Sequence, residues 1–172
     1  MVQYRLACPA DAEALSVVRQ RSWTDAYRGI YPDAMIDQYD YESHARQFLR
    51  QMEQTDREIY VVEDGARVIG YFSIGTADWY RDIPVCLHSL YLLPEYHRRG
   101  IGTHIMKVAA DWCRQRGYST FFNSCNPHNR KAMAFYKAMG GILGEMDDGY
   151  DDPGADQCYY EYTVTESLAI YR

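Results

Sequence analysis

Residues 90–103 read LYLLPEYHRRGIGT, and this stretch decides the fold. It begins as the end of a buried strand, predicted over residues 85–93, because strand-forming residues dominate there and stop at Pro94. It continues through a glycine-containing turn into a helix predicted over residues 100–117, which ends at Gly117. A strand that enters a helix through a short turn brings the free N–H groups of the helix start close to the strand.

The glycines of the turn, Gly100 and Gly102, indicate a site for an anion. Backbone N–H groups at a helix start together carry roughly half a positive charge, and a residue without a Cβ lets a ligand reach the main chain. Arg98 and Arg99 add positive charge beside them. A plain helix start with solvated arginines explains the same residues equally well. Two nucleotide motifs are excluded, because a Walker loop ends in Gly-Lys-Ser/Thr and a dinucleotide fingerprint needs a third glycine.

The length and composition of the chain bound its class. Its 172 residues fit a single domain over residues 1–172. With 47% hydrophobic and 24% charged residues, it is typical of a soluble globular protein, and disorder, collagen-like repeats and a coiled coil are excluded. The net charge of −6 disfavours nucleic acid or an anionic membrane as a partner. A cationic small molecule or peptide suits this field better.

The five cysteines and the N-terminus point to the cytoplasm. The cysteines are odd in number, widely spread and without a C-x-x-C pair, so neither a disulfide framework nor a zinc site is expected, and no metal is assigned. The N-terminus lacks the basic segment and apolar run of a secretory signal. The longest apolar-rich stretch, residues 85–93, is far shorter than the roughly 20 residues that cross a bilayer. No membrane association is expected.

Strand formers, apolar residues at helical spacing and turn residues predict the remaining elements. They are a strand at 2–7, a helix at 11–21, a helix that begins at Pro32, a helix capped by Ser43, a hairpin within 59–74, a strand at 118–124, a helix at 129–139 and then two strands, the last at 157–165. No internal repeat or low-complexity linker interrupts them. The order predicts one α/β domain with a mixed sheet.

Two segments resemble the signatures of the GCN5-related N-acetyltransferase (GNAT) family. Residues 97–102, HRRGIG, resemble the pattern Gln/Arg-x-x-Gly-x-Gly/Ala, with His97 where Gln or Arg is usual. Residues 129–140 resemble the second signature, in which an Asn begins a helix that carries a Phe/Leu-Tyr pair and ends in Gly. Gly141 replaces the usual Phe, a change expected to affect core packing rather than chemistry.

The resemblance covers residues 2–165 and implies a fold and an activity. The implied fold is a single α/β domain with a mixed, mostly antiparallel sheet of about seven strands flanked by helices. Residues 22–57 match only in helical character and in Trp23 followed by residues 27–30, YRGI. The implied activity is that of an N-acyltransferase, which moves an acyl group, expected to be acetyl, from coenzyme A to a primary amine of a small molecule or peptide.

The resemblance also implies which residues bind acetyl-CoA. The strand before the turn would run along the pantetheine, and the turn would hold the pyrophosphate through main-chain amides. Asn129 and Tyr136 of the second signature would lie near the coenzyme, although Asn129 could instead serve only as a helix N-cap. The implied coenzyme-binding residues are Leu90, Tyr91, Leu92, Arg98, Arg99, Gly100, Ile101, Gly102, Thr103, Asn129 and Tyr136.

Two residues are candidates for proton transfer. An alkylamine with a pKa near ~10.4 is mostly protonated at neutral pH, so a base or a water relay must take its proton. His88 is the candidate base, because the carboxylate that some family members carry at the position of Cys86 or Ser124 is missing here. A hydrogen-bonded core histidine is the alternative reading of His88. Tyr136 matches the family tyrosine near the coenzyme sulfur, and its reference pKa lies only roughly 1.5 units above that of a thiol. Packing of residues 135–136 against the sheet is its alternative role.

The acceptor pocket implied by the resemblance is aromatic and acidic. Such a lining attracts an ammonium group through charge and cation–π contact. A solvated acidic loop is the alternative for residues 145–152, and above all for Asp151 and Asp152. A homodimer is compatible with the sequence. The candidate acceptor residues are Trp23, Tyr27, Tyr31, Trp79 and Asp147.

Two other functions are open at this point. A catalytically silent domain that binds acetyl-CoA as a sensor or interaction module would keep the glycine turn and could lack His88. Cys86 or Cys125 could accept the acyl group in a ping-pong scheme, although the sequence shows no activating partner for either thiol.

Overall fold

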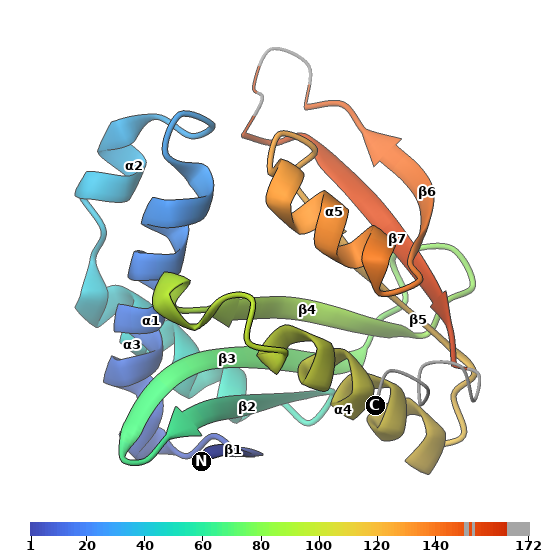
Figure 1. Cartoon of the computed structure of the whole chain (residues 1–172), viewed down its shortest axis with the longest axis horizontal. Coiled ribbons are helices and arrows are strands. Elements are labelled where there is room, and N and C mark those ends of the chain that lie inside the picture. The colour runs from blue at the N-terminus through green and yellow to red at the C-terminus, as the bar shows by residue number, and fades with distance from the viewer. Residues whose placement is uncertain (150–151, 153, 165–172) are drawn as a thin grey trace. The chain divides into compact units, whose positions relative to one another are not determined.

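The computed structural model describes residues 1–149, 152 and 154–164 (Figure 1). Its strands form one seven-stranded sheet in the order β1-β2-β3-β4-β5-β7-β6. β4 and β5 are parallel, whereas the pairs β1-β2, β2-β3, β5-β7 and β6-β7 are antiparallel. The predicted mixed, mostly antiparallel α/β sheet flanked by helices is therefore confirmed.

The chain divides into two compact units, residues 1–75 with 89–99 and residues 76–88 with 100–172, of which the structure describes the part up to residue 164. Strand β4 (Val85–Leu92) belongs to both. In the second unit Cys86 stands opposite Phe122. In the first unit Gly70 of β3 approaches β4 so closely that a Cβ there would lie 2.7 Å from the Tyr91 carbonyl oxygen. The central strand thus contributes residues to each unit.

The first unit combines three strands and the end of β4 with three helices. Its elements are β1 (Val2–Leu6), α1 (Ala12–Tyr27), α2 (Asp33–Asp37), α3 (Tyr41–Met52), β2 (Arg57–Asp64) and β3 (Arg67–Thr76). Leu15 of α1 and Phe48 of α3 are buried, as are Val61 and Phe72 of the antiparallel β2 and β3. Burial of these apolar side chains is the main force that holds such helices on a sheet.

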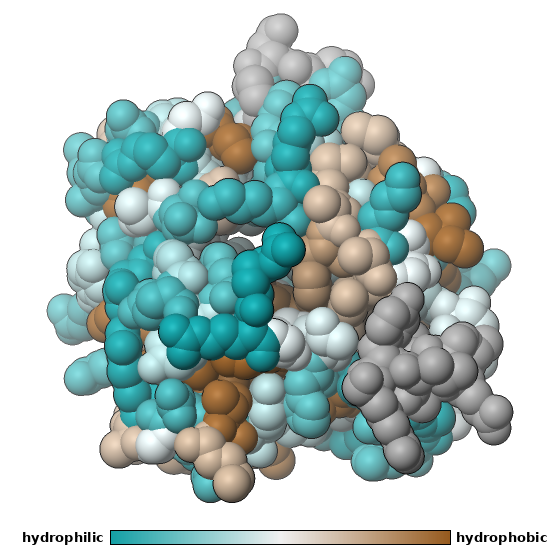
Figure 2. All heavy atoms as spheres, in the orientation of Figure 1, coloured by the Kyte–Doolittle hydropathy of each residue, from teal (hydrophilic) through white to brown (hydrophobic). Residues whose placement is uncertain are grey.

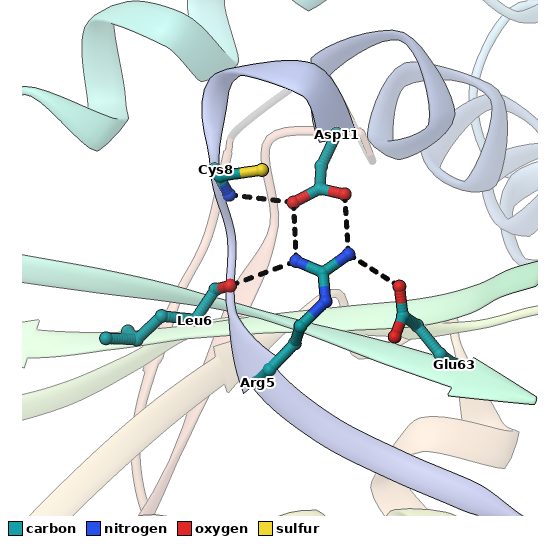
Figure 3. A network of polar contacts seen from close by, with 5 residues as sticks. All are labelled: Arg5, Leu6, Cys8, Asp11 and Glu63. Carbon is teal, nitrogen blue, oxygen red and sulfur yellow. Dashed lines mark hydrogen bonds and ion pairs between the residues drawn. The ribbon is translucent and has the colours of Figure 1, made fainter. Parts of the chain in front are cut away.

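A polar network ties β1 to β2 and to the turn before α1 (Figure 3). Both Nη atoms of Arg5 donate to the Asp11 carboxylate at 2.8 Å, and Nη2 also donates to Glu63. Asp11 Oδ2 accepts a further hydrogen bond of 2.7 Å from the backbone N–H of Cys8. The bond from Arg5, followed by that from Cys8, lowers the pKa of Asp11 to about 2. The buried Asp11 therefore stays ionised in the folded protein.

The second unit contains α4 (Ile101–Gln115), β5 (Thr120–Cys125), α5 (Arg130–Ala138), β6 (Ile142–Asp147) and β7 (Gln157–Thr163). Ile105 of α4 and Phe121 of β5 are fully buried. β7 lies between β5 and β6, and Ser124 of β5 stands opposite Tyr159. β6 is the edge strand, and in the face shown in Figure 2 apolar residues reach the surface over it. The exposed apolar side chains of β6 are Ile142, Leu143 and Met146.

Several predicted boundaries need correction. The first helix extends to Tyr27 instead of stopping at residue 21, which places Trp23 on the helix. Asp40, rather than Ser43, caps α3, because the helix begins at residue 41 and the Asp40 carboxylate accepts the Ser43 N–H at 2.9 Å. The other elements agree within a few residues, except that residue 165 of the last predicted strand lies outside the described part. Within the described part, no helix has the length and apolar character needed to span a bilayer.

Candidate active site

The turn before α4 has a backbone conformation that suits the binding of an anion. Gly100 adopts a left-handed conformation with φ 78°, which suits a glycine because it has no Cβ, and Arg98 also has a positive φ of 61°. No side chain of the described residues caps α4, and its first turn contains no acidic residue. The helix start is therefore uncapped and positively polarised, and its first N–H groups are those of Ile101, Gly102 and Thr103.

The turn is held in place by its own side chains in the first unit. Nε2 of His97 lies 2.9 Å from the Leu92 carbonyl oxygen and donates to it, since a carbonyl can only accept. The residue that departs from the family pattern thus fastens the turn to the end of β4. Cζ of Arg99 lies 4.8 Å from the centroid of the Tyr96 ring, and Tyr96 is the last residue of the short helix η2 (Pro94–Tyr96).

The two signature segments meet in the second unit. A Cβ at Gly102 would lie 3.1 Å from Cε2 and Cζ of Phe135, so the helix start and the α5 ring are in close contact. Asn129 is the N-cap of α5, where its side chain accepts the Ala132 N–H at 3.1 Å. A Cβ at Gly141 would lie 2.8 Å from Tyr162 Oη, so this tyrosine occupies the space beside the glycine.

The two candidate proton-transfer residues both belong to the second unit. Tyr136 is 8% exposed, and its ring centroid lies 5.3 Å from that of Phe135 and 5.8 Å from that of Tyr160. His88 is partly buried on β4, and strand alternation places it on the same face as the buried Cys86. Tyr136 packs against Tyr160 of the sheet, as its alternative role expects, whereas Phe135 lies against Gly102 of α4. This packing does not prevent a chemical role for the Tyr136 phenol.

Three of the five candidate acceptor residues form an aromatic cluster in the first unit. Trp23 stacks on Tyr31 with centroids 5.7 Å apart, and Tyr27 makes edge contacts with both. Trp23 Nε1 donates to Tyr91 Oη at 3.0 Å. The cluster is therefore attached to β4, the strand proposed to run beside the coenzyme.

The other two candidates, Trp79 and Asp147, are joined through Tyr159 in the second unit. Tyr159 Oη donates to Asp147 Oδ2 at 2.7 Å, and the Tyr159 ring lies 6.1 Å from that of Trp79. Burial and this hydrogen bond to the carboxylate raise the pKa of Tyr159 well above its usual value. Trp79 is 54% exposed and packs edge-on against Phe122 at 4.9 Å. Asp151, which belongs to the acidic segment at residues 145–152, lies outside the described residues.

A salt-bridged group that the sequence did not reveal fixes the loop of Trp79. Arg81 donates from Nε to Glu145 at 2.9 Å and from Nη1 to Glu161 at 2.8 Å. Tyr80 Oη donates to the same Glu161 oxygen at 2.7 Å. Gly144 leaves room for this group, since a Cβ there would collide with Tyr80 and Glu161. These residues are far apart in the sequence and meet only in the folded chain, so no local pattern could have indicated them.

The cysteines give little support to a thiol nucleophile. Cys125 and Cys158 stand opposite each other on β5 and β7, with their Sγ atoms 3.5 Å apart. Their contact and burial raise the pKa of the Cys125 thiol, which disfavours the thiolate that would attack an acyl group. Cys86 is buried among Tyr80, Phe122 and Tyr159. Within the described ranges, no group of three or more His, Cys, Asp or Glu side chains is arranged to hold a metal ion.

Comparisons with known proteins agree with the fold and with the two signature segments. A sequence model described as the acetyltransferase (GNAT) family matches residues 20–141. An uncharacterized N-acetyltransferase of Mycobacterium bovis is 28% identical over 135 residues, which cover 76% of this chain and 82% of the relative. The aminoglycoside N(6')-acetyltransferase type 1 of Acinetobacter genomosp. 13 is 26% identical over 124 residues, which cover 69% of this chain and 81% of that enzyme.

A solved structure has the same fold. The PaiA N-acetyltransferase of Thermoplasma acidophilum, in complex with coenzyme A, has a TM-score of 0.76 and 23% sequence identity. The match covers 95% of this chain and 99% of that one.

Proposed function

This chain belongs to the acetyltransferase (GNAT) family, and from that membership we propose that it transfers an acetyl group from acetyl-CoA to a primary amine of a small molecule or peptide. The observation that carries the proposal is the uncapped start of α4, which follows a left-handed glycine and packs through Gly102 on Phe135. Acceptor and coenzyme are inferred from this site and from the family.

The residues of the turn fit the diphosphate of coenzyme A. The amides of Ile101, Gly102 and Thr103 provide donors at a helix end that carries roughly half a positive charge. Gly100 lets an anion approach these donors, and Arg98 and Arg99 add charge. The side chains before the turn, on residues 90–92, are proposed to line the pantetheine. Asn129 is proposed to orient the coenzyme from the start of α5.

The proposed chemistry is a direct attack of the amine. When bound, acetyl-CoA supplies the thioester carbonyl that the amine attacks. His88 takes the proton of the acceptor ammonium at an imidazole nitrogen, alone or through a water molecule. Tyr136 holds a proton at its phenol oxygen for the departing sulfur. Its burial supports this role, because a proton donor works best where water is excluded.

The proposed acceptor-binding residues of each unit are aromatic or acidic side chains. Trp23, Tyr27 and Tyr31 offer ring faces, and Trp79 offers an exposed one. Asp147 offers a carboxylate held in position by Tyr159. Ring faces and a carboxylate together attract an ammonium group.

The proposed compartment is the cytoplasm, which the cysteines support. All five are free thiols, as expected for a protein kept in a reducing environment.

A catalytically silent acetyl-CoA sensor is the competing function, and one experiment separates the two. The purified protein is incubated with acetyl-CoA and a panel of amino acids, polyamines, aminoglycosides and peptides, and free CoA and acetylated product are measured by mass spectrometry. The proposal expects amine-dependent release of CoA with an equal amount of acetylated amine. Binding of acetyl-CoA without release for any amine would favour the sensor.

A further inference from the structure

One buried side-chain nitrogen has no hydrogen-bond partner in the described part of the chain, and it is Nε of Arg19. Arg19 lies partly buried on α1, in the first unit. Its Nη1 atom donates to Gln47 Oε1 of α3 at 3.1 Å. Because buried polar atoms in native proteins are nearly always hydrogen-bonded, an unpaired buried donor indicates a partner that the chain does not supply.

An aromatic ring lies over the guanidinium of Arg19. Its Cζ atom lies 5.0 Å from the centroid of the Trp23 ring, one helical turn further along α1. Its charge also acts on Tyr39, His44 and Tyr71 from the neighbouring elements. Ring faces attract a cation but do not neutralise its charge, so this surrounding leaves Arg19 without a counter-ion.

Other arginines of the same region show the contrast. Arg21 pairs with Glu95 at 3.1 Å, and Arg28 pairs with Asp37 at 2.7 Å. Among the described residues, no carboxylate forms an ion pair with Arg19, whose polar partner is the Gln47 amide. A partly buried positive charge without a carboxylate is unusual, because buried charges in proteins are normally paired.

The free edge of the guanidinium has the shape of a carboxylate-binding fork. Nε and Nη2 lie side by side in the guanidinium plane, and with Nη1 engaged by Gln47 they form the edge that can bind both oxygens of a carboxylate. Nε is shielded from solvent, so a ligand that binds both nitrogens requires a local rearrangement that exposes Nε. Trp23 shields one side of Arg19 and is also a proposed acceptor residue.

We propose that Arg19 binds a carboxylate of the acceptor, so that the substrate is an amine that also carries a carboxylate, such as an amino acid or a peptide. This inference rests on the proposed acetyl transfer and narrows its substrate class. Trp23 connects the two, because it contacts Arg19 on one side and donates to Tyr91 of β4 on the other. The carboxylate site therefore adjoins the strand proposed to run along the coenzyme.

A kinetic comparison tests the proposal. The kcat/KM of each of four amino-acid acceptors is compared with that of its carboxamide, in which a carboxylate is replaced by a neutral amide. The four acids are glycine, aspartate, glutamate and 4-aminobutyrate. At least one acid should be preferred over its amide by about tenfold or more in kcat/KM, the effect of one charge-assisted hydrogen bond. Arg19→Gln should abolish that preference, because it should raise the KM of the acid far more than the KM of its amide. Arg21→Gln is the matched control, because it removes the same charge from an exposed arginine of α1 that pairs with Glu95. This variant should keep the preference.

Two outcomes would overturn the proposal. The first is a wild-type protein that acetylates amines but has the same kcat/KM for every acid in the panel and its amide. The second is an Arg19→Gln variant that lowers kcat/KM for acids and amides equally, which is the result expected of a merely structural arginine. Arg19→Lys keeps the charge but lacks the fork, so it should retain stability and lose most of the preference.

A binding measurement keeps the proposal testable even if no amine is acetylated. The Nε–H resonance of Arg19 is assigned in a nitrogen–proton correlation spectrum through its loss in Arg19→Lys, and N-acetylglycine and N-acetylglycinamide are titrated in turn. The carboxylate should shift this resonance saturably, and the neutral amide should not. The same comparison is made for N-acetyl derivatives of the other panel acids. If no carboxylate shifts the resonance, the site does not exist; if one does while CoA is never released, only the proposed acetyl transfer fails.

Discussion

Gly102 lies directly against the ring of Phe135, where a Cβ would be 3.1 Å from both Cε2 and Cζ. The glycine belongs to the start of α4 and the ring belongs to α5, so this contact packs one signature segment on the other. A larger residue at 102 must push the ring away or tilt the helix start. The glycine is therefore required for packing as well as for access to the main chain.

Gly102→Val should destabilise the protein by ~1–3 kcal/mol, the usual cost of overpacking a close contact, and should weaken CoA binding. Phe135→Leu, which removes part of the obstructing ring, should reduce the cost of the valine, so the double variant is more stable than the sum of the single changes predicts. Urea unfolding of the four proteins measures this coupling. His104→Val, at an exposed position of the same helix, is the control for the general effect of a valine in α4. Helix propensity does not account for a loss of stability at position 102, because valine is a better helix former than glycine. Strict additivity would contradict the proposed contact.

Tyr136→Phe should lower kcat by roughly 10²–10⁴-fold, the range typical of a lost general acid, with little change in the dissociation constant for acetyl-CoA. The ring is kept, so its packing against Phe135 and Tyr160 remains. Steady-state kinetics and calorimetry measure the two effects. Tyr160→Phe serves as the matched control on β7. An unchanged kcat in Tyr136→Phe would remove the phenol from the chemistry.

His88→Gln should lower the rate at neutral pH and remove the acid limb of the pH–rate profile that an imidazole base produces. The wild-type rate should rise as pH increases through this limb, because only the neutral imidazole can accept a proton. Profiles of kcat/KM between acidic and mildly alkaline pH measure it. His104→Gln, on the exposed side of α4, should keep the limb. A limb that persists in His88→Gln would assign the base to a water molecule or to another residue.

Asp11→Asn should remove about 2 kcal/mol of stability at neutral pH. The pKa of Asp11 is lowered from its ordinary 3.8 to about 2, so its contribution is complete above pH 4 and is lost as pH falls toward 2. Urea unfolding at a series of pH values should therefore show a flatter acid limb in the variant. Asp37→Asn, at an exposed ion pair with Arg28, should leave the acid limb nearly as it is in the wild type. Equal limbs for Asp11→Asn and the wild type would contradict the network of Figure 3.

The parts of the fold that depend on local patterns could be predicted from the sequence. Strand β4, the glycine turn and α4 follow from residues that are adjacent in the chain, because alternation, helical spacing and glycine positions are local signals. The length of α1 was underestimated because Trp23 and Tyr27 continue the helix with residues of only moderate helix propensity. There tertiary packing, not local preference, decides the boundary.

The partners of the candidate site residues could not be predicted, because they depend on strand register. Tyr159 meets Asp147 only since β6 and β7 pair with a bulge between Leu143 and Met146. Arg19 and Gln47 meet because two helices, separated by a third, pack together. No spacing in the sequence fixes such encounters, and an orphaned nitrogen becomes visible only when every neighbour has been placed.

Calorimetric titration of the wild type and of Gly102→Val with CoA, acetyl-CoA and pantetheine, which lacks the diphosphate and the phosphorylated adenosine, decides whether the amides at the start of α4 hold a diphosphate. We expect saturable heat of association with CoA and acetyl-CoA, much weaker binding of pantetheine, and loss of the difference in Gly102→Val. No heat with CoA or acetyl-CoA, or equal affinity for pantetheine, would contradict the assignment of this turn and leave the proposed reaction without a bound donor.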